Sequence, residues 1–127
     1  MDIQWPNQTE IWELNRLFGF NATGYEQDWG IEFSDETRAE EFFLSYVNNE
    51  LSIPQKMSVM QLILASFDEL MYTGQDNKKL WQQIANALVN EASIHMHTIE
   101  YWCCDGETNK ENMFPTTPRM REVASAL

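Results

Sequence analysis

The stretch PQKMSVMQLILASFDELM, residues 54–71, carries the widest apolar face of any segment in this chain. Its apolar residues recur at the spacing that places side chains along one side of an α-helix. Pro54 suits the first helical turn, Ser52 stands shortly before it, and Gly74 follows the last apolar residues. We expect this helix to form the centre of the core and to bury Met57, Val59, Met60, Leu62, Ile63, Leu64, Phe67, Leu70 and Met71.

Four other segments are expected to form helices around it, three of them on the same apolar spacing. The first spans about residues 8–18, the second begins at Ser34 or Asp35, the third is expected to be capped by Asp76, and the last covers residues 117–127. The residues expected on the buried faces of the first three are Ile11, Leu14, Leu17 and Phe18; Ala39, Phe42, Phe43, Tyr46 and Val47; and Leu80, Trp81, Ile84, Ala85 and Leu88.

Two segments fit more than one structure. Trp29, Ile31 and Phe33 alternate with polar residues, which allows a short strand or extended segment after the loop at 20–30. Residues 93–104 fit a helix better than a strand, with a break near Ser93. The fold class predicted is mainly α: one globular domain over residues 1–127, a compact bundle of four to six helices with room for a minor pair of short strands.

Composition and cysteine usage suggest a globular cytoplasmic protein. Of the 127 residues, 43% are hydrophobic and 13% aromatic, which is typical of a packed domain and not of a disordered chain. No apolar run approaches the roughly 18 residues of a membrane span, and the first residues do not resemble a signal peptide. The two cysteines, Cys103 and Cys104, are adjacent, a spacing that suits a structural disulfide poorly.

The formal net charge of −12 is unevenly distributed along the chain. Residues 1–55 hold eleven carboxylates against two arginines, and the remaining residues hold nine carboxylates against six basic side chains. Such a charge repels nucleic acid and anionic membranes and attracts basic partners. Acidity that serves only solubility is the alternative explanation.

No segment has the pattern of a catalytic or metal site. The cluster His95, His97, Glu100, Cys103 and Cys104 contains metal-ligand residue types, but neither a helix nor a strand brings all of them to one point. Both histidines lie close to the cysteines in sequence, which is an awkward way to aim a base at a thiol. We therefore expect no catalytic residues, no metal and no cofactor, with Ile99 and Trp102 of this segment packing on the core.

The acidic helix that begins near residue 35 is the surface we expect to bind a partner. With Ala39, Phe42 and Tyr46 turned inward, the opposite face carries an apolar residue among acids, an arrangement that suits an interface. A merely solvated face is the alternative. The expected partner-binding residues are Glu26, Asp28, Glu32, Thr37, Glu40, Glu41, Leu44 and Asn48.

The stretches RLFGFNATGYEQDWGIEF (residues 16–33) and HTIEYWCC (residues 97–104), the latter followed by TPRMRE (residues 117–122), resemble segments of small bacterial proteins encoded beside toxins. The chain thus resembles immunity proteins of contact-dependent growth inhibition and related polymorphic toxin systems. The resemblance implies a cytoplasmic protein, not an enzyme, that binds a basic cognate toxin domain, such as a nuclease, and neutralises it by occlusion. A small regulatory or adaptor protein, including an inhibitor that mimics DNA, is the second hypothesis, and a metal-dependent enzyme is the third.

Overall fold

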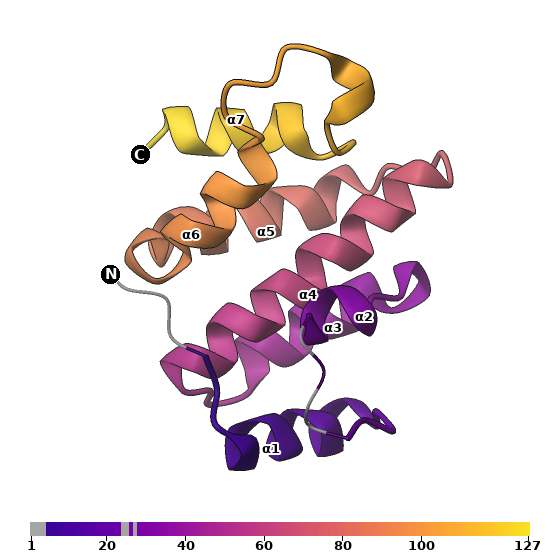
Figure 1. Cartoon of the computed structure of the whole chain (residues 1–127), viewed down its shortest axis with the longest axis vertical. Helices are drawn as coiled ribbons and strands as arrows, with labels where there is room; N and C mark the ends of the chain where they lie inside the picture. Colours follow the sequence, from indigo (N-terminus) through magenta and orange to yellow (C-terminus); the bar gives the residue numbers. More distant parts are fainter. Residues whose placement is uncertain (1–4, 24–25, 27) are drawn as a thin grey trace.

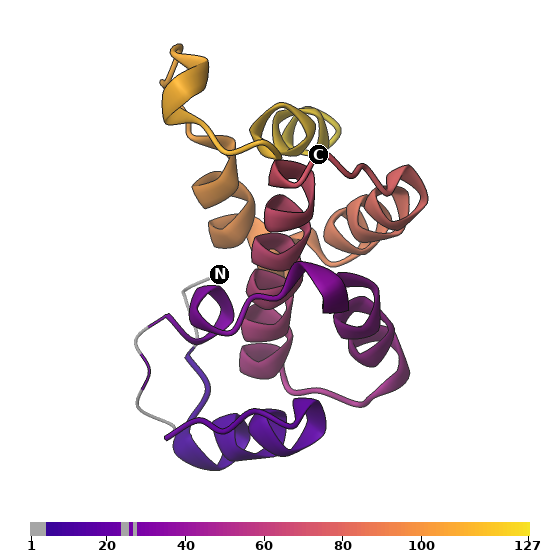
Figure 2. The ribbon, with the colours of Figure 1, turned by 90° about the vertical axis from the view of Figure 1, so that its right-hand side faces the viewer.

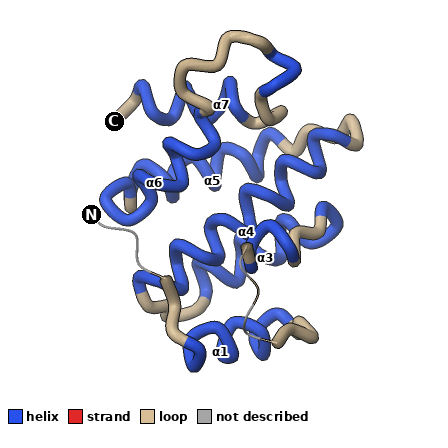
Figure 3. The backbone as a smooth tube through the Cα atoms, viewed as in Figure 1, coloured by secondary structure: helices blue, strands red, loops and turns tan. Residues whose placement is uncertain are grey.

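The computed structural model describes residues 5–23, 26 and 28–127. Within these ranges the chain forms helices and loops without a strand, which confirms the mainly α fold (Figure 3). The described residues form seven α-helices, slightly more than expected, because the short segment after the first loop is helical as well. In chain order the elements are α1 (Gln8–Phe18), α2 (Trp29–Glu32), the 3-10 turn η1 (Glu36–Arg38), α3 (Ala39–Asn48), α4 (Ile53–Tyr72), α5 (Lys78–Asn90), α6 (Ala92–Cys103), the 3-10 turn η2 (Lys110–Asn112) and α7 (Thr117–Ser125).

Helix α4 is the central element, as the sequence predicts. Ser52 caps its N-terminus in a capping box with Gln55, and Pro54 occupies the first turn. Every residue from 62 to 68 is buried. Figure 2 shows the reason: α2 and α3 flank α4 on opposite sides of its lower half, and α5 and α6 flank its upper half. A helix covered on several sides must be apolar over most of its circumference.

Helix α1 lies across the lower end of the molecule (Figure 1). Asn7 and Glu10 form a capping box at its start, and Gly19, in the left-handed region with φ of 72°, ends it. The side chain of Ser52, the cap of α4, also hydrogen-bonds the Glu10 carboxylate, and the Gln55 amide donates to the Glu10 carbonyl oxygen at 3.0 Å. The starts of α1 and α4 are therefore tied together.

An aromatic cluster joins α1, α2 and α3. It contains Phe18, Phe20, Trp29, Phe33 and Phe42, whose neighbouring ring centroids lie 4.8–6.3 Å apart. The guanidinium of Arg38 lies 4.8 Å from the Phe42 ring centroid and donates to the Phe18 carbonyl oxygen at 2.8 Å. The Arg38 side chain thus packs on the aromatic cluster and provides a hydrogen bond to a carbonyl oxygen that the end of α1 leaves unpaired.

The upper end is held together by hydrogen bonds from α7 and the residue before it. Arg121 donates to the carbonyl oxygens of Cys103, Cys104 and Glu107 at 2.8–2.9 Å, which satisfies groups that the end of α6 leaves open. Thr116 donates through its backbone and its hydroxyl to the buried Asp68 carboxylate of α4. Burial raises the pKa of Asp68 although both bonds oppose that shift.

The structure corrects four sequence-based expectations. The segment at Trp29 is the helix α2 and not a strand, because its alternation covers too few residues to tell the two apart. Leu17 and Val47 were expected to be buried, but both are exposed, because they lie at the margins of the buried faces of α1 and α3. Asp76 does not cap α5: Asn77 accepts from the Leu80 amide, and Asp76 pairs with Arg119 at 2.6 Å.

Candidate functional site

The residues expected on the exposed face of the acidic helix do lie together on α3. Glu40, Glu41, Leu44 and Asn48 are all exposed and line one shallow depression with Ser45 and Asn49. Leu44 is 46% exposed and Val47, one turn further on, is 53% exposed, so this surface carries two apolar side chains. We call it the α3 surface: Glu40, Glu41, Leu44, Val47 and Asn48.

The two carboxylates of the α3 surface differ in their surroundings. Glu41 forms an ion pair with Arg38 at 2.6 Å, and this hydrogen bond lowers the pKa of Glu41. Glu40 has no ion pair with any side chain in the described ranges. Because an exposed pair is screened by water, Glu41 still contributes to the field around the molecule, but part of its charge is compensated at short range.

Of the other expected residues, those near α2 lie apart from the α3 surface. Asp28 and Glu32 are exposed on and beside α2 and line a second shallow depression with Ile31 and Glu26. Thr37 is the exception, because it lines a third depression together with Glu40 of the α3 surface; its amide and hydroxyl both donate to Asp35. Since α2 and α3 lie on opposite sides of α4 (Figure 2), the expected set forms separate surfaces and not one continuous face.

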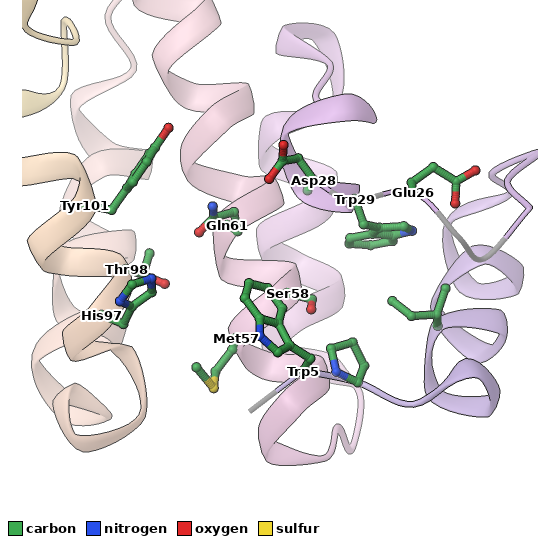
Figure 4. A pocket seen from close by; sticks show the side chains of 13 residues that line it. Trp5, Glu26, Asp28, Trp29, Met57, Ser58, Gln61, His97, Thr98 and Tyr101 are labelled. Carbon is green, nitrogen blue, oxygen red and sulfur yellow. The ribbon is translucent and has the colours of Figure 1, made fainter. Parts of the chain in front are cut away.

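A pocket of about 290 Å³ lies between α2, α4 and α6. Figure 4 shows Gln61 and Met57 on α4, His97 and Tyr101 on α6, and Asp28 beside α2 arranged around the opening, with Trp5 closing the lower side. We call this the central pocket. Its walls are Trp5, Pro6, Ile11, Glu26, Asp28, Trp29, Gly30, Met57, Ser58, Gln61, His97, Thr98 and Tyr101.

The wall formed by α2 is held rigidly. The Trp29 indole N–H donates to the buried Asn15 side-chain oxygen at 2.7 Å, which fixes the ring against α1. A Cβ atom at Gly30 would lie 2.8 Å from the Leu62 backbone nitrogen, so only glycine lets α2 approach α4 this closely. The position of Asp28, one residue before Trp29, is set by these two contacts.

Asp28 makes the central pocket acidic. Its carboxylate is exposed, does not cap α2, and has neither a hydrogen bond nor an ion pair with the described part of the chain. Glu26, half-buried on the same wall, accepts from the Thr23 amide and hydroxyl at 2.8 and 2.9 Å. The lining therefore combines two carboxylates with the aromatic rings of Trp5, Trp29 and Tyr101.

The segment that carries the histidines and cysteines is helix α6, and its inward face packs on the core. Ile99 and Trp102 are buried, as expected. His95 is also buried: its Nε2 lies 2.8 Å from the Tyr46 hydroxyl, which donates to Glu91 at 2.6 Å. Glu91 in turn pairs with Lys56 at 2.5 Å. This chain of polar groups joins α3, α4 and the junction of α5 with α6.

The protonation states in this cluster follow from burial and pairing. Burial lowers the pKa of His95 to about 4, so its ring is neutral at pH 7. Burial opposes ionisation of Glu91, but the hydrogen bonds from Lys56 and Tyr46 outweigh it and the pKa of Glu91 is lowered. On α6, burial raises the pKa of the Cys103 thiol, which disfavours the reactive thiolate.

Neither a metal-binding cluster nor a membrane-spanning helix is found among the described residues. No three or more of their His, Cys, Asp and Glu side chains are arranged to hold a metal ion. No helix in the same ranges has both the length and the apolar character needed to cross a bilayer.

No relative identifies this site. The chain matches no family model, no curated protein and no solved structure. What its surfaces do must therefore be inferred from their chemistry alone.

The acids of the α3 surface were expected from the sequence, whereas most of the central pocket was not. Asp28 and Glu26 were expected to bind a partner, whereas Trp5, Gln61, His97 and Tyr101 were not. A signal does exist: Ser58 and Gln61 interrupt the apolar run of α4 at a spacing of three residues, and His97 and Tyr101 stand four apart on α6. In each pair the two side chains lie on the same side of a helix whose other sides are largely apolar, which indicates a partly polar surface beside the core.

Proposed function

We propose that the protein is a stoichiometric inhibitor of a basic protein domain, as an immunity protein is of its toxin. The observation that carries this proposal is the α3 surface, where Leu44 and Val47 stand exposed beside the carboxylates of Glu40 and Glu41. Apolar anchors surrounded by charge are typical of protein interfaces. A surface that needed only solubility would not require the two exposed apolar side chains.

The spatial distribution of charge supports a basic partner. Helices α1, α2 and α3 form the lower half of the molecule, and α5, α6 and α7 form the upper half (Figure 1). Because the carboxylates are concentrated in residues 1–55, the uneven charge along the chain becomes an uneven charge in space. We call the lower half the acidic end. A field of this kind accelerates encounter with a positively charged partner and orients it.

Inhibition would follow from occupancy and not from chemistry. Carboxylates of the acidic end would pair with lysine and arginine side chains of the partner, and Leu44 would become buried and slow dissociation. A nuclease domain fits this charge best, because a groove that binds phosphates is itself basic. The proposal places the protein in the bacterial cytoplasm, where it would meet an incoming toxin.

The test is inhibition of a toxin domain encoded by the adjacent gene. The purified domain should lose its activity when the protein is added in a one-to-one ratio, and the two should co-elute as a complex. The double variant with Glu40→Lys and Glu41→Lys should inhibit more weakly at 150 mM salt. Full toxin activity in the presence of excess wild-type protein, or a neighbouring gene that encodes no such domain, would contradict the proposal.

A further inference from the structure

The central pocket has the chemistry of a receptor for an organic cation. Asp28 supplies a carboxylate that no other described residue pairs with, and Glu26 adds a second carboxylate to the same wall. Trp5, Trp29 and Tyr101 supply aromatic rings, whose faces attract cations. An anion would be repelled by this lining, and a purely apolar ligand would displace water from the Asp28 carboxylate without offering it a partner.

The size of the pocket suits one side chain better than a larger ligand. Its volume of about 290 Å³ is at the lower limit of the roughly 300–1,000 Å³ typical of small-molecule sites. One of its walls is α2, which belongs to the acidic end, where the net negative field would draw a basic surface.

We propose that the central pocket binds the guanidinium group of an arginine side chain presented by the basic partner. This inference rests on the proposed function, because it takes that partner as the source of the arginine. The guanidinium hydrogen-bonds the Asp28 carboxylate and stacks on the aromatic wall.

Arginine fits this lining better than lysine does. A guanidinium is planar, so it stacks on indole and phenol rings while its five N–H donors remain available. Besides Asp28, the lining offers the Gln61 amide oxygen and the Ser58 hydroxyl as acceptors. In Figure 4 Gln61 lies between Asp28 and Tyr101, so the carboxylate and the amide offer acceptors at two points of the same lining, which suits the fork of donors on a guanidinium. A lysine ammonium has three donors at one point and no flat surface.

The first experiment uses the whole protein and a minimal probe, N-acetyl-arginine methylamide. Its binding is followed by NMR through the indole N–H signals of Trp5 and Trp29, which line the pocket. We expect saturable shifts of these two signals. The citrulline analogue has nearly the same shape without the charge and should bind at least tenfold more weakly. Equal binding of both probes, or no saturable shift with arginine, would overturn the proposal.

The second experiment separates the pocket from the general field of the molecule. Asp28→Asn removes the carboxylate from the pocket, and Trp5→Ala removes an aromatic wall that is 72% exposed and therefore unimportant for folding. Glu32→Gln is the matched control, because it removes one charge from α2, close to Asp28, but Glu32 does not line the pocket. We expect about tenfold weaker arginine binding in the first two variants and unchanged binding in the control. Equal weakening by Glu32→Gln would contradict a specific site.

The third experiment distinguishes failure of this inference from failure of the proposed function. The three variants are titrated against the toxin domain of the adjacent gene. Loss of affinity in Asp28→Asn and Trp5→Ala, but not in Glu32→Gln, would support the pocket as the receptor for a partner arginine. If all three variants bound the toxin domain with full affinity, the pocket would not be the receptor for a partner arginine, but the proposed inhibitory function would be unaffected. If the protein bound the arginine probe but formed no complex with the toxin domain, both the proposed inhibitory function and the assignment of a partner arginine as the natural ligand would be wrong.

Discussion

His95 is the buried histidine of the protein, and its surroundings keep it neutral. Glu91, Lys56 and the Tyr46 hydroxyl are the ionisable groups around it, contributed by α3, α4 and the residue between α5 and α6. Its Nδ1 atom is buried without a hydrogen-bond partner in the described structure. Protonation of the ring would place a charge in the core, with Lys56 as a nearby cation.

We predict that His95 makes the protein less stable as the pH falls from 6.5 to 4. Its pKa is about 4 in the folded state and near 6.5 when unfolded, so the unfolded chain binds the proton first and unfolding is favoured below pH 6.5. By pH 5 the loss should be about 2 kcal/mol relative to pH 7. Urea unfolding of wild type and His95→Gln measures it: the variant should lack this decline.

His97→Gln is the control for that experiment, because His97 is exposed on the same helix. This variant retains His95 and should therefore retain the decline in stability, and the carboxylates are the same in all three proteins. Parallel curves for wild type and His95→Gln would show that His95 does not titrate as described.

Trp102 should be among the most important residues for stability. Its ring is buried and lies 4.4 Å from the Phe114 ring centroid and 5.4 Å from that of Tyr101. We predict that Trp102→Ala lowers the free energy of unfolding by about 3–5 kcal/mol, as large-to-small changes of buried aromatic residues do. Chemical denaturation provides the measurement, and a loss below about 1 kcal/mol would be inconsistent with this packing. Trp12→Ala, at an exposed tryptophan, should have little effect.

At the scale of elements, Gly30 controls how closely α2 approaches α4. An added Cβ would lie 2.8 Å from the Leu62 nitrogen and 3.0 Å from the Gln61 Cβ, so Gly30→Ala must push the two helices apart. We predict a loss of about 1–3 kcal/mol, together with weaker arginine binding because Gly30 also lines the central pocket. Ile31→Ala, at an exposed position of the same helix, should leave both quantities nearly unchanged. If Gly30→Ala were as stable as the wild type, the close approach of α2 to α4 would not be needed for stability.

Helix positions could be predicted from the sequence where caps and periodicity agree. The range 8–18 matches α1, and Ser52 with Pro54 starts α4 as expected. A short element offers no such agreement, and this is why α2 was open to a strand interpretation. Leu17 and Val47 were wrongly expected to be buried for a related reason, because the width of a buried face depends on how many neighbours cover the helix.

The α3 surface and the central pocket differ in predictability for a physical reason. The α3 surface lies on one helix, so a rotation of about 100° per residue is enough to find its exposed side chains. The pocket draws on α2, α4, α6 and the segment before α1. Which helices adjoin is decided by long-range packing, which the local sequence pattern does not contain.

At the scale of the whole molecule, the acidic end should govern the rate of association with a basic partner. We predict that Glu40→Lys with Glu41→Lys slows association and flattens its dependence on salt, because such charges act mainly on the encounter. The control, Glu107→Lys with Glu111→Lys, changes the net charge equally but lies before α7 in the upper half. Stopped-flow binding at two salt concentrations compares them. Equal slowing by both pairs would show that only the net charge matters.

Leu44 should act on the lifetime of the complex. We predict that Leu44→Ala speeds dissociation several-fold without slowing association, because burial of an apolar anchor stabilises the bound state. Val89→Ala is the matched control: Val89 is 41% exposed on α5, close to the value for Leu44, but lies outside the acidic end. Thermal melts of both variants verify folding. An unchanged dissociation rate in Leu44→Ala would place the contact elsewhere.

The uneven placement of charge also gives the molecule an electric dipole along its long axis. On a positively charged chromatography resin or an amine-coated sensor, the acidic end should attach first and be hidden from solution. The C-terminus lies with α7 at the opposite end, and Leu127 is exposed (Figure 1). A capture tag at the C-terminus on a neutral surface would therefore leave α2, α3 and the central pocket facing the solution.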